Sequence, residues 1–181
     1  EFRQRLAEFG LELHPDKTRL IEFGRFVAEN RRRRGEGKPE TFDFLGFTHS
    51  CDKTRKGKYI VLRQTVKKRM RRKLKEVKGQ LRQRLHDPTD AVGAYLRSVV
   101  NGHNRYYGVP RNGPALNSFR HAIVWLWWRS LQRRSQRHRS QRKLLRRFRR
   151  WVSLFIPLAH ILQPYPEQRL RGMTQGRSPV R

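Results

Sequence analysis

The chain has 181 residues, which is enough to bury one good core or two small ones. It carries 44 Lys and Arg against 14 Asp and Glu, giving a formal net charge of +30, and 35% of its residues are hydrophobic. Four Trp, five Tyr and ten Phe exclude a purely disordered basic tail, because such tails are poor in aromatic residues. We therefore expect a folded, strongly basic protein.

The charge is distributed unevenly along the chain. All but one of the 14 acidic residues lie within the first 90 positions, and the segment from Ala91 to Pro166 contains none. A basic surface without acids of its own finds its counter-charge in a partner, most often a polyphosphate backbone. An anionic membrane is the alternative, but no long apolar segment or lipidation signal accompanies the charge. The sequence thus predicts a nucleic-acid partner and no membrane.

The single cysteine, Cys51, excludes an internal disulfide and leaves no Cys-x-x-Cys pair for zinc. His49 and Cys51 alternate in a strand pattern, where such residues simply share a face, so we predict no metal site. There is no signal peptide, and the chain starts at Glu rather than Met. We expect this N-terminus to be a truncation or an artificial boundary.

The first elements are short. Glu1 to Phe9 is typical of the end of a helix, and Gly10 of its C-terminal stop. Residues 11–13 and 18–23 are then predicted as short strands, joined by a turn at His14-Pro-Asp-Lys17.

A polar, Arg-rich loop is predicted from Asn30 to Glu40. The aromatic-rich segment Phe42 to Ser50 and the segment Tyr59 to Leu62 predict a hairpin across Asp52 to Lys58.

Four helices are predicted downstream. The first begins near Thr65 and has one apolar stripe with Lys and Arg over the rest of its surface: Val66, Met70, Leu74, Val77, Leu81 and Leu85. Pro88 and Thr89-Asp90 are expected to cap the second, which frays from Gly102 to Gly108. Its apolar positions are Val92, Tyr95, Leu96, Val99 and Val100.

The third helix is predicted to start at Asn112-Gly-Pro114, with proline in the first turn. Its stripe is Leu116, Phe119, Ile123, Leu126, Trp127 and Leu131. A fourth helix runs from Gln141 to Leu154, and the tail from Pro157 is expected to be extended. Between Arg129 and Arg150, eleven of 22 residues are Lys or Arg and none is acidic. Because a solvated charge run normally mixes signs, this segment predicts phosphate binding.

Two segments, Gly10-Leu-Glu-Leu-His-Pro-Asp-Lys-Thr18 and Thr41-Phe-Asp-Phe-Leu-Gly-Phe47, precede this basic helical region. In this order they resemble the late palm motifs and the thumb of a group II intron reverse transcriptase, the intron-encoded maturase. In that family a Tyr-Ala-Asp-Asp strand with the metal-binding aspartates lies upstream of the first segment. The resemblance implies an α+β fold: a truncated palm remnant over 1–62, a mainly helical thumb over 63–155 and an extended basic tail over 156–181.

The resemblance also implies roles for residues in the two segments. Lys17 matches an accessory catalytic lysine that stabilises charge, or donates a proton, as pyrophosphate leaves the incoming nucleotide. By pattern alone, the segment is a Gly-capped helix that leads into a hairpin, and Lys17 is a surface residue of that hairpin. Leu45 and Gly46 match the primer grip, whose backbone presses on the primer terminus; the missing side chain of Gly46 suits such an approach.

A third similarity is to the thumb signature of the same family, in Asn104-Arg-Tyr-Tyr-Gly108 and Leu116-x-x-Phe119. We expect Tyr106, Phe119 and Trp127 to be core residues. The predicted nucleic-acid contacts on the helices are arginines: Arg105, Arg111, Arg129, Arg133, Arg134, Arg142, Arg146, Arg149 and Arg150.

For the full-length parent, the resemblance implies RNA-directed DNA synthesis, with Mg²⁺, and assistance to intron splicing. Without the catalytic aspartates, we expect this fragment to hold no cofactor or metal and not to polymerise alone. Its expected partners are group II intron RNA and an RNA–DNA template–primer duplex, in a cytoplasmic ribonucleoprotein. The alternative is a non-enzymatic basic RNA-binding protein of the ribosomal or RNA-chaperone type.

Overall fold

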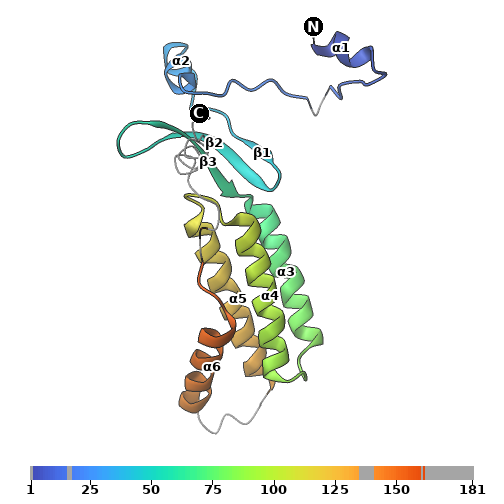
Figure 1. Cartoon of the computed structure of the whole chain (residues 1–181), viewed down its shortest axis with the longest axis vertical. Helices are drawn as coiled ribbons and strands as arrows, with labels where there is room; N and C mark the ends of the chain where they lie inside the picture. Colours follow the sequence, from blue (N-terminus) through green and yellow to red (C-terminus); the bar gives the residue numbers. More distant parts are fainter. Residues whose placement is uncertain (1, 16–17, 135–140, 160, 162–181) are drawn as a thin grey trace, which may run out of the picture. The chain divides into compact units, whose positions relative to one another are not determined.

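The computed structural model describes residues 2–15, 18–134, 141–159 and 161 (Figure 1). The fold is α+β, with these elements in chain order: α1 (Phe2–Ala7), α2 (Val27–Arg33), β1 (Phe42–Phe44), β2 (Phe47–Lys53), β3 (Tyr59–Thr65), α3 (Lys67–Gln83), α4 (Thr89–Tyr107), α5 (Gly113–Arg134) and α6 (Gln141–Phe155). The chain divides into two compact units. One comprises Glu1–Phe42 and Ser50–Val61, the other Asp43–His49 and Leu62–Arg181.

The N-terminal segment differs in part from the prediction. The helix is present, and Gly10 follows it with a φ of +68°. Neither predicted strand, over 11–13 or over 18–23, forms among the described residues. Leu20 is 99% exposed, so the segment lacks the burial that a strand pattern requires. At the predicted turn, the Thr18 N–H donates to the His14 carbonyl at 3.0 Å, while Asp16 and Lys17 lie outside the described residues.

The prediction that a loop begins at Asn30 is also wrong, because α2 continues to Arg33. Arg33 donates to Glu29 one helical turn earlier, at 2.6 Å, which supports the helix. Arg34 pairs with Glu22 and with Glu36, and this guanidinium lowers the pKa of both carboxyl groups. Arg33 and Arg34 therefore have acidic partners within their own unit.

The three strands form one antiparallel sheet in the order β1-β2-β3. The predicted hairpin is confirmed as the β2–β3 pair, but the segment Phe42 to Ser50 is two strands rather than one, and β2 continues to Lys53. β3 continues beyond Leu62 to Thr65. β1 and β2 are joined by a two-residue turn at Leu45–Gly46, where φ is +46° and +84°. Positive φ at both central residues is the signature of a type I′ turn, which matches the twist of the strands it joins.

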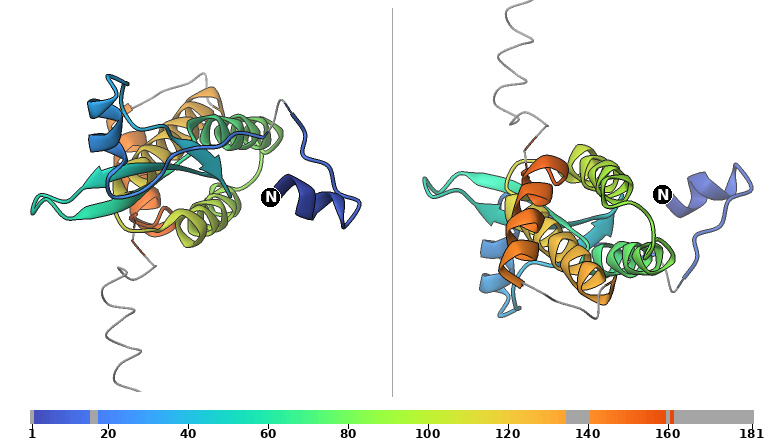
Figure 2. Two further views of the ribbon diagram at one scale, coloured as in Figure 1. Left: turned by 90° about the horizontal axis from the view of Figure 1, so that it is seen from above. Right: turned by 90° about the horizontal axis from the view of Figure 1, so that it is seen from below.

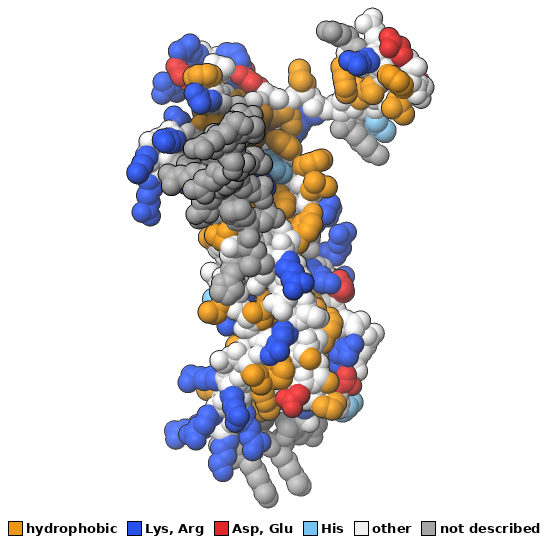
Figure 3. Space-filling model, in the orientation of Figure 1, with side chains coloured by type: hydrophobic (Ala, Val, Ile, Leu, Met, Phe, Trp, Pro, Cys, Tyr) orange, Lys and Arg blue, Asp and Glu red, His pale blue; other side chains and the backbone are white. Residues whose placement is uncertain are grey.

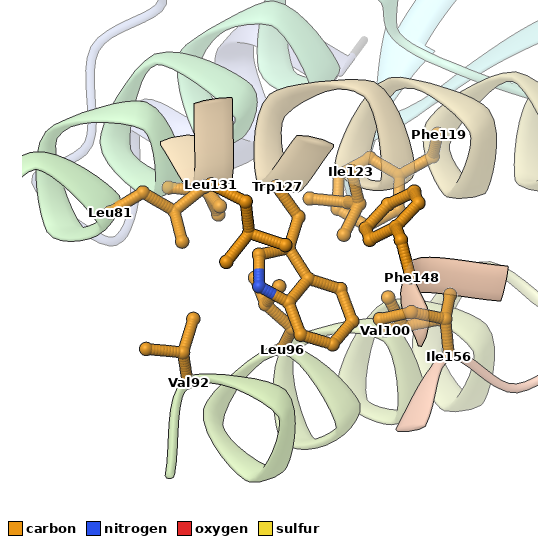
Figure 4. Close-up of a cluster of buried hydrophobic side chains, with 11 residues drawn as sticks. Leu81, Val92, Leu96, Val100, Phe119, Ile123, Trp127, Leu131, Phe148 and Ile156 are labelled. Atoms are coloured by element: carbon orange, nitrogen blue, oxygen red, sulfur yellow. The ribbon is translucent and has the colours of Figure 1, made fainter. Parts of the chain in front are cut away.

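The helices of the second unit lie side by side, α3 and α4 against α5, and α6 against α4 (Figures 1 and 2). Trp127, 1% exposed, lies within their core, edge-on to Phe148 of α6 at 5.6 Å between ring centroids (Figure 4). The buried residues of this core are Val77, Leu81, Val92, Leu96, Val100, Phe119, Ile123, Trp127, Leu131, Phe148 and Ile156. The apolar stripes predicted for the first three of the four downstream helices are thus confirmed as the faces that pack in this core.

The second helix differs from the prediction at both ends. Its N-cap is Pro88, and no side chain caps it. At its C-terminus it does not fray, but continues to Tyr107. His103 and Asn104 are buried there, and Asn104 Nδ2 donates to the Leu158 carbonyl at 3.1 Å, which holds the last turns in place. The fourth helix is confirmed, and most of the predicted tail, from residue 162, lies outside the described residues.

Candidate nucleic-acid interface

The second unit, which we call the helical unit, hydrogen-bonds both residues of the β1–β2 turn to its helices. The Tyr106 hydroxyl, in the last turn of α4, donates to the Leu45 carbonyl at 2.6 Å. The Gly46 carbonyl accepts a hydrogen bond from the Val66 N–H, just before α3, at 3.0 Å. The tip of the hairpin is therefore held between the beginning of α3 and the end of α4.

Gly46 is required by space as well as by backbone conformation. A Cβ at this position would lie 2.9 Å from the Tyr107 hydroxyl oxygen and 3.4 Å from Arg69 Nη1. The protein's own Tyr107 therefore lies close to Gly46, and the predicted approach of a primer terminus to this glycine stays a prediction. Leu45, by contrast, is 63% exposed and presents its side chain to solvent.

An aromatic cluster lies behind the turn. The Phe47 ring stacks on Tyr106 at 5.9 Å and lies edge-on to Tyr107 at 5.2 Å. Phe119 and Trp127 are core residues as predicted, but Tyr106 is 47% exposed, so its assignment to the core was wrong. The ring of Tyr106 covers Phe47 while its hydroxyl extends to the turn, a division of labour typical of tyrosine.

His103 lies under this cluster. Its ring stacks on Phe119 at 3.7 Å, it is 8% exposed, and its Nε2 has no hydrogen-bond partner. Burial lowers the pKa of His103 to about 4, because the charged form would lose its hydration. The imidazole is therefore neutral at pH 7.

Asn112 joins the three elements that meet here. Its Oδ1 accepts from the Thr65 N–H at 3.1 Å, while Nδ2 donates to Thr65 Oγ1 and to the Tyr107 carbonyl, both at 2.8 Å. Asn112 is 1% exposed, so these bonds replace water completely. The end of β3, the end of α4 and the start of α5 are thereby held in one arrangement.

Two hollows open beside the turn along the basic side of α3. One, of about 330 Å³, is lined by Asp43, Leu45, Gly46, Val66, Lys68, Arg69 and Arg72. The other, of about 470 Å³, lies between α3 and α4 and is lined by Arg69, Met70, Arg72, Lys73, Glu76, Ser98, Val99, Gly102, His103, Tyr106 and Tyr107. Arg69 and Arg72 line both, so we call the two hollows together the turn–α3 groove.

The two acids in this groove already have partners. Asp43 accepts a hydrogen bond from the Thr48 hydroxyl at 2.6 Å, and Glu76 pairs with Lys73 at 2.7 Å. No described carboxylate forms an ion pair with Lys68, Arg69 or Arg72. These three cations were not singled out from the sequence; the signal was the density of Lys and Arg at the start of the first long helix.

The predicted arginines lie in several places. Arg105 is exposed on α4, and Arg111 follows that helix with a φ of +68°. Arg129 and Arg133 are exposed on α5. On α6 the predicted contacts are all exposed: Arg142, Arg146, Arg149 and Arg150. Figure 3 shows Lys and Arg side chains gathered over α6 and along α3.

Arg134 has a structural position. It donates to the carbonyls of Arg84 and Asp87, at 3.1 Å and 2.6 Å, and to Thr89 Oγ1 at 3.4 Å. The guanidinium thus donates hydrogen bonds to backbone carbonyls at and beyond the C-terminal end of α3. Lys17 lies outside the described residues.

Within residues 2–15, 18–134, 141–159 and 161, no three His, Cys, Asp or Glu side chains gather in a group that could hold a metal ion. The helices of this part of the chain also include none with the length and apolarity needed to cross a bilayer.

Neither a protein-family model, nor a curated protein, nor a solved structure matches this chain.

Proposed function

We propose that the helical unit binds the phosphate backbone of structured RNA or of an RNA–DNA duplex, as the thumb of a protein of the group II intron reverse transcriptase and maturase type. The observation that carries this proposal is the turn–α3 groove, where a rigid hairpin tip stands beside Lys68, Arg69 and Arg72.

The groove fits a phosphate backbone by charge and by rigidity. Lys68, Arg69 and Arg72 have no described acid as an ion-pair partner, whereas Arg31, Arg33 and Arg34 of the first unit do. Cations without internal counter-charges gain most from a polyanion, since binding releases the condensed counterions of the nucleic acid. Such contacts position a duplex without reading its sequence.

The packing also supports the family assignment. The two segments with the strongest resemblance to the primer grip and to the thumb signature are far apart in sequence, yet Phe47 of one packs against Tyr106 and Tyr107 of the other. A thumb that holds its grip hairpin needs a contact of this kind. The proposal assigns to the fragment nucleic-acid binding alone and no polymerisation.

The test is the salt dependence of binding. The triple variant Lys68→Gln, Arg69→Gln, Arg72→Gln is compared with the wild type on an RNA–DNA duplex by filter binding. Each lost phosphate contact should reduce the slope of log affinity against log salt by about 0.9, so three contacts amount to about 2.7. A matched control removes three exposed cations of the first unit: Arg3→Gln, Arg5→Gln and Arg25→Gln.

Equal slopes in the two triple variants would contradict the proposal, because the effect would then reflect net charge alone. A second comparison separates the two candidate functions. A thumb with a grip hairpin should bind a duplex with a recessed primer 3′ end more tightly than a blunt duplex. A general RNA-binding protein should not distinguish the two ends.

A further inference from the structure

A third hollow lies on the other flank of α3, between α3 and α5. It has a volume of about 140 Å³ and is lined by Lys78, Leu81, Arg82, Leu85, Trp125, Leu126, Arg129, Ser130 and Arg133. It shares no residue with the turn–α3 groove, and the proposed duplex contact makes no use of it.

Trp125 is the unusual residue at this hollow. Its side chain is 54% exposed, although tryptophan is the largest apolar side chain and is ordinarily well covered. Arg129, one turn along α5, places its guanidinium carbon 4.7 Å from the centre of the Trp125 ring. An exposed indole held beside a guanidinium offers flat surfaces on which another planar ring can stack.

The rim of the hollow is uniformly positive. Lys78 and Arg82 contribute from α3, and Arg129 and Arg133 from α5, while no carboxylate is among the lining residues. None of these four cations forms an ion pair with a carboxylate of the described chain. The floor is apolar, made by Leu81, Leu85 and Leu126. The ligand must therefore combine a flat, apolar body with negative charge on both sides.

The volume of the hollow limits the size of the ligand. Pockets that enclose a drug-sized ligand have volumes of roughly 300 Å³ or more, so 140 Å³ admits a ring rather than a whole nucleotide. The bases of a duplex are stacked on one another and their faces are inaccessible. A base in a single-stranded stretch has both faces free, and stacking on aromatic side chains is how proteins hold such strands.

We propose that Trp125 and Arg129 form a stacking site for one unpaired base of a single-stranded nucleic acid, with Lys78, Arg82 and Arg133 holding the flanking phosphates. This site is independent of the duplex contact at the turn–α3 groove. The helix α3 then separates a face that binds a duplex backbone from a face that binds an unpaired strand.

Three probes test the proposal by fluorescence anisotropy: a short oligothymidylate, an abasic strand of the same length, and a duplex of the same length. One stacked base contributes a factor of about 5 to 150 in affinity, so the wild type should prefer the oligothymidylate to the abasic strand by such a factor. Trp125→Ala should abolish this preference and leave duplex affinity unchanged. Trp125→Phe, which keeps an aromatic face, should retain part of it.

Arg129→Lys provides a second, conservative variant that keeps the charge and loses the planar group. It should weaken the oligothymidylate more than the abasic strand. Circular dichroism melting checks that each variant is folded, and Trp125→Phe with Arg129→Lys decides the question if Trp125→Ala does not fold. An unchanged preference in these variants, or an equal loss for all three probes, would overturn the proposal. Trp125-dependent binding of a polyglutamate peptide in place of the strand would also overturn it, in favour of an acidic protein partner.

Discussion

The Tyr106 hydroxyl and the Leu45 carbonyl are 2.6 Å apart, although the two residues are separated by 61 positions in the sequence. The hydrogen bond joins the tip of the β1–β2 hairpin to the last turn of α4. Because the Gly46 carbonyl is bonded in addition to the Val66 N–H, the tip has little freedom to move against the helices. The position of the hairpin, and with it the shape of the turn–α3 groove, thus depends on α4.

Tyr106→Phe removes this hydrogen bond and keeps the ring that stacks on Phe47. We expect a loss of about 0.5–1.5 kcal/mol in the free energy of unfolding, since a single hydrogen bond contributes that much. Affinity for the RNA–DNA duplex should fall as well, because the tip is no longer fixed. Urea denaturation measures the first effect and filter binding the second. Unchanged duplex affinity in a destabilised variant would mean that the tip does not contribute to binding.

Gly46→Ala tests the close approach to Tyr107. The added Cβ would stand 2.9 Å from the Tyr107 hydroxyl, at a φ of +84° that side chains rarely adopt. We expect a cost of about 1–3 kcal/mol, the range for a strained backbone position. In a Tyr107→Phe background the steric part should disappear and only the backbone part remain. A double-mutant cycle by chemical denaturation separates the two; purely additive effects would show that the contact is not tight.

Asn112→Ala should be among the most destabilising single changes in the helical unit. It leaves the Thr65 N–H without its buried partner and removes one of the two hydrogen bonds that the Tyr107 carbonyl accepts, the other coming from the Val109 N–H. Each buried group left unpaired costs about 1–3 kcal/mol. Asn117→Ala, at an exposed position of α5, is the matched control and should change little. Thermal melting of the two variants gives the comparison, and equal melting temperatures would refute the structural role of Asn112.

His103 should make the helical unit sensitive to acid. Its pKa is about 4 in the folded chain and 6.5 in the unfolded chain, so the unfolded state binds more protons between these values. The free energy of unfolding should therefore fall as the pH decreases from about 6.5 to about 4, by on the order of 3 kcal/mol.

His103→Phe keeps an aromatic ring on Phe119 and removes the titrating group. The pH dependence of unfolding across that window should be much shallower in this variant than in the wild type. Identical profiles in urea titrations at a series of pH values would show that His103 is not the group responsible.

The arginines of α6 form a separate test of phosphate binding. All four of Arg142, Arg146, Arg149 and Arg150 are exposed, so their joint replacement by Gln should leave the fold intact. If every one contacts a duplex phosphate, the slope of log affinity against log salt should flatten by about 3.6. The loss should be nearly equal for unrelated RNAs, because phosphate contacts carry no sequence information. An unchanged slope would leave α3 as the principal surface.

Much of the helical unit could be predicted because its helices carry regular apolar stripes. The periodicity of Val77 and Leu81, or of Phe119, Ile123 and Trp127, is a local signal that tertiary packing reinforces. The predictions failed where the decisive contact is distant in sequence. Asn104 holds the end of α4 through its hydrogen bond to the Leu158 carbonyl. The local sequence around Gly102, which predicted fraying, contains no information about this distant partner.

The candidate site could be predicted only in part, because several of its contacts join residues that are distant in the sequence. Leu45 and Gly46 were singled out through their resemblance to the primer grip, and the missing side chain of Gly46 suited a close approach. That the approach is to Tyr107, and that Lys68, Arg69 and Arg72 stand beside it, follows from the folding of α3 and α4 onto the hairpin. Tyr106 was assigned to the core for its aromatic ring, but its hydroxyl bond to Leu45 keeps it at the surface.

The packing of α6 matters during protein synthesis, because α6 leaves the ribosome after the helices that it covers. Phe148 covers Trp127, and Phe155 lies so close to Gly93 that a Cβ there would be 2.5 Å from its ring. The bonds from Arg120 to Pro157 and from Asn104 to Leu158 come later still. During synthesis, α3, α4 and α5 emerge before α6, so the apolar side that α6 covers is exposed to water until α6 has formed. A stop codon before Phe148 should therefore yield an aggregation-prone chain rather than a smaller folded one.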